Sequence, residues 1–443
     1  MRVAFKHFAL ALCLAWLAGC TSGPVQRVSQ SSTPAAFSEA HQLAQQDARG
    51  NATRIEALLA TLDDASLTRL TTALAANDPL YAYAGRAMLR RGLTPPHPFS
   101  HSWDFSAREP ADTDGYRPPR KVAVLLPMTG NLATAAKPVR DGLLAAYYAE
   151  RRARPAISFH NSANGAYAAY QEAVAQGADF VIGPLDRGDV DTLFARSDLS
   201  VPVLALNRGQ RSPPERSLSF ALAPEDEGVA AAEFLMANQA PNALIVLASG
   251  DTTMRRTADA FAQRMQDRGG KVVDTLTLSA DNAGLAAALN AAAQKGEIGA
   301  LYFAARGEQV RAIMPLIEQN PALAKARRVA ASQIANGAGK GEDSAQLDGI
   351  IFPSAALEVR TLPGIPAAPG ALSATARGAA ARLFAFGHDA WLITAYLEKL
   401  ATQREGGLEG ATGKLELDGF GNIMRTPQWS VLQGGTSLPY GGR

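Results

Sequence analysis

The segment Lys121-Val-Ala-Val-Leu-Leu-Pro-Met-Thr-Gly130 decides the fold of this chain. It opens with a continuous apolar run, 122–126, which is typical of a strand buried on both faces of a parallel sheet. Strands and helices alternate after it: we expect strands at 122–126, 156–159, 180–182, 201–206 and 217–222, and helices at 138–151, 167–176 and 189–195. The helix at 138–151 would open with a proline near its first turn. This succession predicts a doubly wound parallel sheet.

A second α/β series follows a helix expected at 225–237. Its strands are expected at 243–248, 272–278, 300–303, 328–331 and 349–352, and its helices at 252–268, 284–294 and 309–318. A long helix at 379–400 and two β segments, 413–417 and 429–432, end the pattern. We therefore expect two lobes. Lobe one would comprise about 121–223 with the segments after about 379, and lobe two about 240–355.

The composition supports a globular protein and excludes several functions. Of the 443 residues, 47% are hydrophobic and 19% charged, which is enough to bury a core and excludes a wholly disordered chain. The formal net charge is only +2, so nothing indicates nucleic acid as a partner. The two cysteines, Cys13 and Cys20, both lie near the N-terminus, so the remaining chain offers no thiol for a disulfide or a metal site.

Residues 1–20, MRVAFKHFALALCLAWLAGC, have the features of an export signal. A basic start precedes an apolar core, 8–17, which is too short to span a bilayer. The end of this segment, Leu17-Ala18-Gly19-Cys20, resembles the bacterial lipobox, in which the cysteine thiol is acylated and becomes the first mature residue. The alternative is an ordinary secretory signal with an incidental cysteine.

The lipobox resemblance implies a signal peptide at 1–19 and a lipid on Cys20. Thr21, which follows the cysteine, resembles the outer-membrane sorting class, so we expect a lipid anchor in the outer membrane on its periplasmic face. Several acyl chains would hold the protein firmly, since each buried methylene contributes about 0.8 kcal/mol.

The chain before residue 121 divides into three further parts. Residues 20–38 are rich in Ser, Thr, Pro and Gln and predict a flexible tether. Residues 39–91 carry four short apolar stripes with helical spacing and predict a small all-α unit that resembles a helical repeat. Residues 92–120 contain six prolines and predict an extended linker to a domain that spans 121–443.

Two α/β halves with a late return helix resemble the type I periplasmic-binding-protein fold, a clamshell whose lobes close on a ligand at the carboxyl ends of the strands. Several ordered motifs are similar to the LpoA family of penicillin-binding-protein activators. They are Lys121–Gly130, Val139-Arg-Asp-Gly-Leu-Leu-Ala-Ala-Tyr-Tyr148, Phe180-Val-Ile-Gly-Pro-Leu185, Phe220-Ala-Leu-Ala-Pro-Glu-Asp-Glu227, Leu301-Tyr-Phe-Ala-Ala-Arg306, Gly387-His-Asp-Ala390 and Gly410-Ala-Thr-Gly-Lys-Leu-Glu-Leu-Asp418. The helical unit here is much shorter than in the longer members of that family.

This resemblance implies an outer-membrane lipoprotein that binds a bifunctional class A penicillin-binding protein and stimulates its synthesis of peptidoglycan. The alternative is a lipid-anchored solute-binding protein that takes up or senses a small, amino-acid-like molecule. Neither interpretation needs a cofactor. The chain has no Gly-x-Ser-x-Gly elbow and no metal-ligand spacing, so we expect no catalytic residue and no metal.

Loops that follow the expected strands supply candidate cleft residues. In lobe one they are Thr129, Gly130, Asp186, Arg187, Asn207 and Arg208, and in lobe two Asp251 and Arg306. Asp186 would repel a ligand carboxylate at the start of its helix, which favours a cleft with a different ligand or none. The alternative is that Asp186 simply caps this helix.

Two aromatic residues in the proline-rich segment are candidates for contact with a partner. Trp103 and Phe105 lie where no helix or strand is expected, so an exposed interface and packing between domains both remain open.

Overall fold

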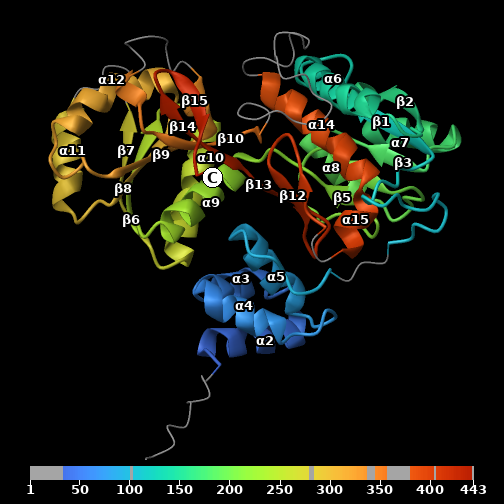
Figure 1. Cartoon of the computed structure of the whole chain (residues 1–443), viewed down its shortest axis with the longest axis horizontal. Helices are drawn as coiled ribbons and strands as arrows, with labels where there is room; N and C mark the ends of the chain where they lie inside the picture. Colours follow the sequence, from blue (N-terminus) through green and yellow to red (C-terminus); the bar gives the residue numbers. More distant parts are fainter. Residues whose placement is uncertain are drawn as a thin grey trace, which may run out of the picture.

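The computed structural model describes residues 33–99, 103–278, 284–336, 345–356, 380–403 and 406–441. The expected lipobox, Leu17 to Cys20, lies outside these residues. Two α/β lobes stand side by side, and a small helical unit lies below both (Figure 1). This arrangement confirms the α/β class and the preceding all-α unit.

The helical unit consists of four helices: α2 (Ala35–Asp47), α3 (Ala52–Ala60), α4 (Asp64–Thr72) and α5 (Tyr81–Arg90). The apolar stripes of these helices meet in one small core that includes Ile55, Leu59 and Leu67. Asp63 caps α4 by accepting a hydrogen bond from the backbone of Ser66. Helix α2 begins at Ala35, so the helical part starts before residue 39, inside the segment predicted to be a tether.

Lobe one is built on a five-stranded parallel sheet with the order β2-β1-β3-β4-β5. The strands are β1 (Lys121–Leu126), β2 (Ala156–Asn161), β3 (Phe180–Ile182), β4 (Val203–Ala205) and β5 (Leu218–Ser219). Helices α7 (Ala166–Ala175) and α8 (Arg187–Phe194) cover one face. Helices α6 (Ala133–Ala149) and α14 (Ala381–Ala395) cover the other, so the sheet is doubly wound as predicted.

Helices α6 and α14 cross at two glycines. A Cβ atom on Gly142 or on Gly387 would lie within 3.0 Å of a backbone carbonyl on the other helix, that of Phe384 or Val139. The close approach therefore requires glycine on both helices. Helix α6 begins earlier than residue 138, which places Pro138 inside the helix rather than near its first turn.

Lobe two is built on a seven-stranded sheet with the order β15-β14-β10-β9-β8-β6-β7. Its parallel strands are β6 (Asn242–Ala248), β7 (Lys271–Leu278), β8 (Ala300–Ala304), β9 (Arg327–Ala330) and β10 (Ile351–Ser354). Its helices are α9 (Pro224–Ala237), α10 (Thr252–Asp267), α11 (Leu285–Gln294) and α12 (Gly307–Glu318), with short 3₁₀ turns at Ser332–Ala335 and, in lobe one, at Ser162–Asn164.

The C-terminal segments differ from the prediction in two ways. The expected helix at 379–400 is interrupted at Tyr396, which separates α14 from α15 (Leu397–Thr402). The Tyr396 hydroxyl donates to Asp114 at 3.0 Å and accepts from Arg152 at 2.9 Å, which holds the break against the segment before β1.

The assignment of all segments after 379 to lobe one is wrong for the last two strands. β14 (Gln428–Gln433) and β15 (Thr436–Pro439) extend the sheet of lobe two, where β14 pairs antiparallel with β10. Strands β11 (Leu408–Glu409), β12 (Lys414–Leu417) and β13 (Ile423–Thr426) form a separate three-stranded sheet that packs on the core of lobe one. Antiparallel pairing allows these short strands to follow one another through tight turns.

Candidate functional site

A cleft of about 600 Å³ lies between the two lobes, and we call it the inter-lobe cleft. Its walls come from loops after β3 and β4 in lobe one, from the N-terminal turns of α9 and α10, from the 3₁₀ turn after β9, and from the start of α14. The carboxyl ends of parallel strands thus converge at this place, as the binding-protein-like fold predicts.

Three of the predicted cleft residues line this cleft: Arg187, Asn207 and Arg208. The side-chain amide of Asn207 donates to the carbonyl of Leu185 at 2.9 Å, and its oxygen accepts from the backbone of Arg208. Asn207 therefore has its hydrogen bonds within lobe one, where it joins the loop after β4 to the loop after β3. Arg187 is exposed.

Thr129, Gly130 and Asp186 are not part of the described cleft wall. Thr129 and Gly130 are exposed in the loop after β1. Asp186 accepts hydrogen bonds from the backbone of Gly188 at 2.8 Å and of Asp189 at 3.1 Å, so it caps α8.

The expected lobe-two residues, Asp251 and Arg306, lie elsewhere too. Both line a separate pocket of about 390 Å³ at the ends of β6 and β8. Asp251 caps α10 by accepting from the backbones of Thr253 and Met254, each at 3.0 Å. Its carboxylate therefore caps α10 and does not line the inter-lobe cleft.

Three consecutive acidic residues at the start of α9 pair with three of the arginines around the cleft. Arg256 holds Glu225 through two hydrogen bonds of 2.7 and 2.9 Å, Arg208 pairs with Asp226 at 3.1 Å, and Arg382 pairs with Glu227. Burial acts to raise the pKa of Glu225, but the hydrogen bonds from Arg256 and the backbone and the charges of Arg256 and Arg187 together hold the pKa below its ordinary value. These charges are therefore satisfied by the protein itself.

Glu227 connects the two lobes. Its carboxylate accepts from both the backbone and the hydroxyl of Ser332 in lobe two, each at 3.0 Å, and pairs with Arg382 at the start of α14 in lobe one. Arg382 also donates to the Ser332 hydroxyl at 2.7 Å. Glu227 is almost fully buried, with 3% of its surface exposed. We call these three residues the lobe latch.

Burial alone would raise the pKa of Glu227, but the charges of Arg382 and Arg425 and the hydrogen bonds from Ser332 hold it below its ordinary value. The sequence-based reasoning missed all members of the lobe latch. The available signal was the acidic run Glu225-Asp226-Glu227 directly after Pro224, where a helix begins.

The aromatic candidates of the proline-rich segment pack inward. Phe105 is 8% exposed and belongs to the core of lobe one, and half-buried Trp103 stacks on it with ring centroids 6.1 Å apart. Phe105 is therefore no exposed anchor for a partner, and the pair packs on the core of lobe one.

A metal-binding group and a membrane-spanning helix are both absent from the described residues. No group of three or more His, Cys, Asp or Glu in them could hold a metal ion. In the same part of the chain, no helix has the length and apolar character needed to cross a bilayer.

Comparison with known proteins agrees with this architecture. Residues 115–435 match the family described as LppC putative lipoprotein. The penicillin-binding protein activator LpoA of Vibrio antiquarius is 27% identical over 347 residues, which cover 70% of this chain and 57% of that protein. The chain thus spans little more than half the length of the curated relatives it matches.

Two solved structures show the same fold. The LpoA (YraM) C-domain from Haemophilus influenzae, described as a regulator of PBP1A, is 21% identical with a TM-score of 0.59, and the match covers 72% of this chain and 99% of that one. A putative branched-chain amino acid ABC transporter from Chromobacterium violaceum is 26% identical with a TM-score of 0.57, covering 70% of this chain and 99% of that one. These matches confirm the two-lobed binding-protein-like fold and the resemblance to the LpoA family. Because its match extends over more than half of the residues, the chain belongs to the LppC putative lipoprotein family.

Proposed function

We propose that this protein is a lipid-anchored activator of a class A penicillin-binding protein. It would regulate peptidoglycan synthesis without itself catalysing the formation of peptidoglycan bonds. The observation that carries the proposal is the chemistry of the inter-lobe cleft. Its carboxylates Glu225 and Glu227 are held by arginines of the same chain, and Glu227 ties lobe two to lobe one. A cleft whose lining carboxylates, Glu225 and Glu227, are both paired with arginines offers little to the amino group of an amino-acid ligand, which needs a free anion as its partner.

The relatives support the same function. The Vibrio protein is named a penicillin-binding protein activator, and the Haemophilus C-domain is described as a regulator of PBP1A. The shared segment corresponds to that C-domain almost completely, since the match covers 99% of it. We therefore place the contact with the synthase on the two-lobed domain.

One observation favours the alternative, a solute-binding protein. Arg187 lines the inter-lobe cleft, is exposed, and has no hydrogen-bonded or ion-paired carboxylate among the described residues. A single free guanidinium could hold a ligand carboxylate. The variant Arg187→Ala separates the two functions, because it would weaken solute binding and leave an adaptor unaffected.

The test uses the chain from residue 21 and a purified class A penicillin-binding protein. We expect a complex with a dissociation constant below about 50 μM and a faster crosslinking reaction, both unchanged by Arg187→Ala. The absence of a complex at that concentration would overturn the proposal. Stabilisation by a common amino acid that disappears in Arg187→Ala would favour the solute-binding alternative.

We also propose that Cys20 carries the lipid and anchors the protein in the outer membrane. The variant Cys20→Ala should appear in the soluble periplasmic fraction, whereas the native chain should sediment with outer membranes. Cys13→Ala is the matched control, because that cysteine lies within the expected signal peptide and should not affect the distribution. Membrane retention of Cys20→Ala would contradict the assignment.

A further inference from the structure

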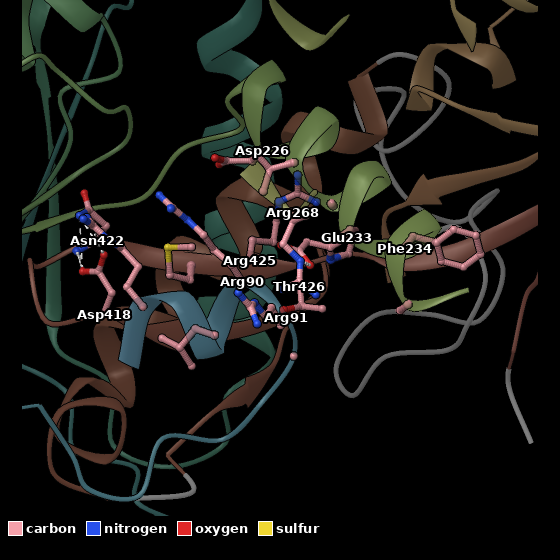
Figure 2. A pocket seen from close by; sticks show the side chains of 18 of the residues that line it. Arg90, Arg91, Asp226, Glu233, Phe234, Arg268, Asp418, Asn422, Arg425 and Thr426 are labelled. Carbon is pink, nitrogen blue, oxygen red and sulfur yellow. Dashed lines mark hydrogen bonds and ion pairs between the residues drawn. The ribbon is translucent and has the colours of Figure 1, made fainter. Parts of the chain in front are cut away.

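A second cavity, of about 340 Å³, lies where the helical unit meets both lobes, and we call it the junction cavity. Helix α5 provides one wall, α9 a second, and the strand β13 with the start of β14 a third (Figure 2). The cavity is separate from the inter-lobe cleft, and of their lining residues the two share only Arg208. Its volume is at the lower end of the range for small-molecule sites.

One side of the junction cavity is apolar. Phe234 of α9 and Trp429 of β14 lie against each other, with ring centroids 4.3 Å apart. Figure 2 places Phe234 at one end of the cavity, away from Asn422 and Asp418. This side would accept an aromatic or aliphatic group by removing it from water.

The remaining wall has an excess of positive charge. Four carboxylates and six arginines line the cavity. The arginines are Arg86, Arg90, Arg91, Arg208, Arg268 and Arg425. Five of them are held by carboxylates. Arg86 and Arg90 pair with Glu56, Arg91 and Arg268 with Asp64, and Arg208 with Asp226.

Arg425 differs from the other five. Its Nη1 donates to the carbonyl of Thr412 over a long 3.3 Å, and its buried Nε has no hydrogen-bond partner among the described residues. No carboxylate of the described residues lies within ion-pair distance of it, and burial lowers the pKa of its guanidinium. The buried Nε atoms of Arg86, Arg91 and Arg208 also have no hydrogen-bond partner. Buried guanidinium donors of this kind are costly unless an acceptor satisfies them.

We propose that the junction cavity binds a small amphiphilic anion, with its carboxylate or phosphate against Arg425 and its apolar part against Phe234 and Trp429. The anion would neutralise part of the excess positive charge on the arginines that line the cavity. Such a ligand would touch the helical unit, lobe one and lobe two at once, and would stabilise their arrangement. This inference is independent of the proposed function, since neither the synthase nor the lipid anchor enters the argument.

The test measures binding to the full chain by titration calorimetry with phenyl phosphate and phenylacetate. Inorganic phosphate provides the charge without the apolar part, and benzyl alcohol the apolar part without the charge. We expect the two amphiphilic anions to bind at least about tenfold more tightly than either reference compound, because each half contributes on the order of 1.4 kcal/mol or more.

Variants locate the site. Arg425→Gln should weaken binding about tenfold or more, and Arg187→Gln, an arginine of the inter-lobe cleft, should leave it unchanged. Ala230→Leu leaves every ion pair in place but reduces the volume of the cavity, so it should abolish binding. This variant still tests the site if Arg425→Gln folds poorly. The proposal is overturned if neither anion binds at about 10 mM, if benzyl alcohol binds as tightly as phenylacetate, or if Ala230→Leu binds like the native chain.

Discussion

The two C-terminal motifs that resemble the LpoA family meet at one buried carboxylate, and this leads to a quantitative prediction. Asp389 of the motif 387–390 is fully buried in α14. It accepts hydrogen bonds from the backbone of Ala411 at 2.5 Å, and from the backbone and hydroxyl of Thr412 at 2.7 and 2.6 Å. Both donor residues belong to the second motif, 410–418. The carboxylate therefore joins the return helix of lobe one to the loop before β12.

The variant Asp389→Ala removes these three hydrogen bonds and a fourth between the carboxylate and Nδ1 of His388 at 3.2 Å, and it leaves two backbone N–H groups buried without these partners. A buried polar group that loses its hydrogen-bond partner costs roughly 1–3 kcal/mol. With two backbone N–H groups left in this state, we expect a loss of about 4 kcal/mol in the free energy of unfolding of lobe one. Asp389→Asn keeps one accepting oxygen and should lose about half as much.

Urea unfolding followed by tryptophan fluorescence measures this effect, because Trp391 is buried in the same helix. Asp198→Ala is the matched control. Asp198 is bonded to Arg196 and Tyr167 on the surface, and its removal should leave the midpoint unchanged. An Asp389→Ala variant within about 1 kcal/mol of the native chain would refute the reasoning, since the bonds would then contribute little.

Three further changes have defined outcomes. Glu227→Gln should destabilise the protein at pH 7. Because the pKa of Glu227 in the folded chain lies below its ordinary 4.5, the native chain should lose its advantage over the variant as the pH falls from about 4.5 through the folded pKa. Parallel pH–stability profiles of the two proteins would contradict this. Gly387→Ala should lower the free energy of unfolding by about 1–3 kcal/mol, because α6 and α14 must separate, whereas Gly299→Ala, whose Cβ meets nothing closer than 3.6 Å, should be tolerated in thermal melts. Arg268→Ala removes a 3.0 Å hydrogen bond to the carbonyl of Leu62, so limited proteolysis should cleave the 92–120 segment faster than in the native chain.

The parallel strands were predictable from the sequence for a physical reason. Strands β1 and β8 are covered by helices on both faces, so nearly all their residues are buried and the sequence shows a continuous apolar run. Strands β13 and β15 were missed because they are four residues long and mostly half-exposed or exposed. Neither has the alternation that indicates a strand, and their pairing depends on neighbours that the local sequence does not specify.

The candidate site was predicted less well, since its electrostatics depend on long-range pairing. The loops after β3 and β4 could be placed at the cleft because strand ends converge there. The carboxylates that neutralise the cleft are on α9, and the hydroxyl that holds Glu227 is 105 residues away on Ser332. No local pattern states which acid will meet which arginine, so Arg187, Arg208 and Arg382 could not be separated into free and paired groups beforehand.

The contacts of the lobes bear on the adaptor role that we propose for this binding-protein-like fold. Closure around a ligand needs lobes that rotate against each other at low cost. Here Glu227 joins the lobes inside the cleft, and outside it the helical unit contacts lobe two through Arg268 and the β12–β13 turn through Phe420, whose ring lies 4.8 Å from that of Tyr83. Rotation of one lobe would therefore break a buried ion pair and the packing of the helical unit together. A two-lobed body restrained at both places presents one fixed surface, which suits docking to a partner enzyme better than capture of a solute.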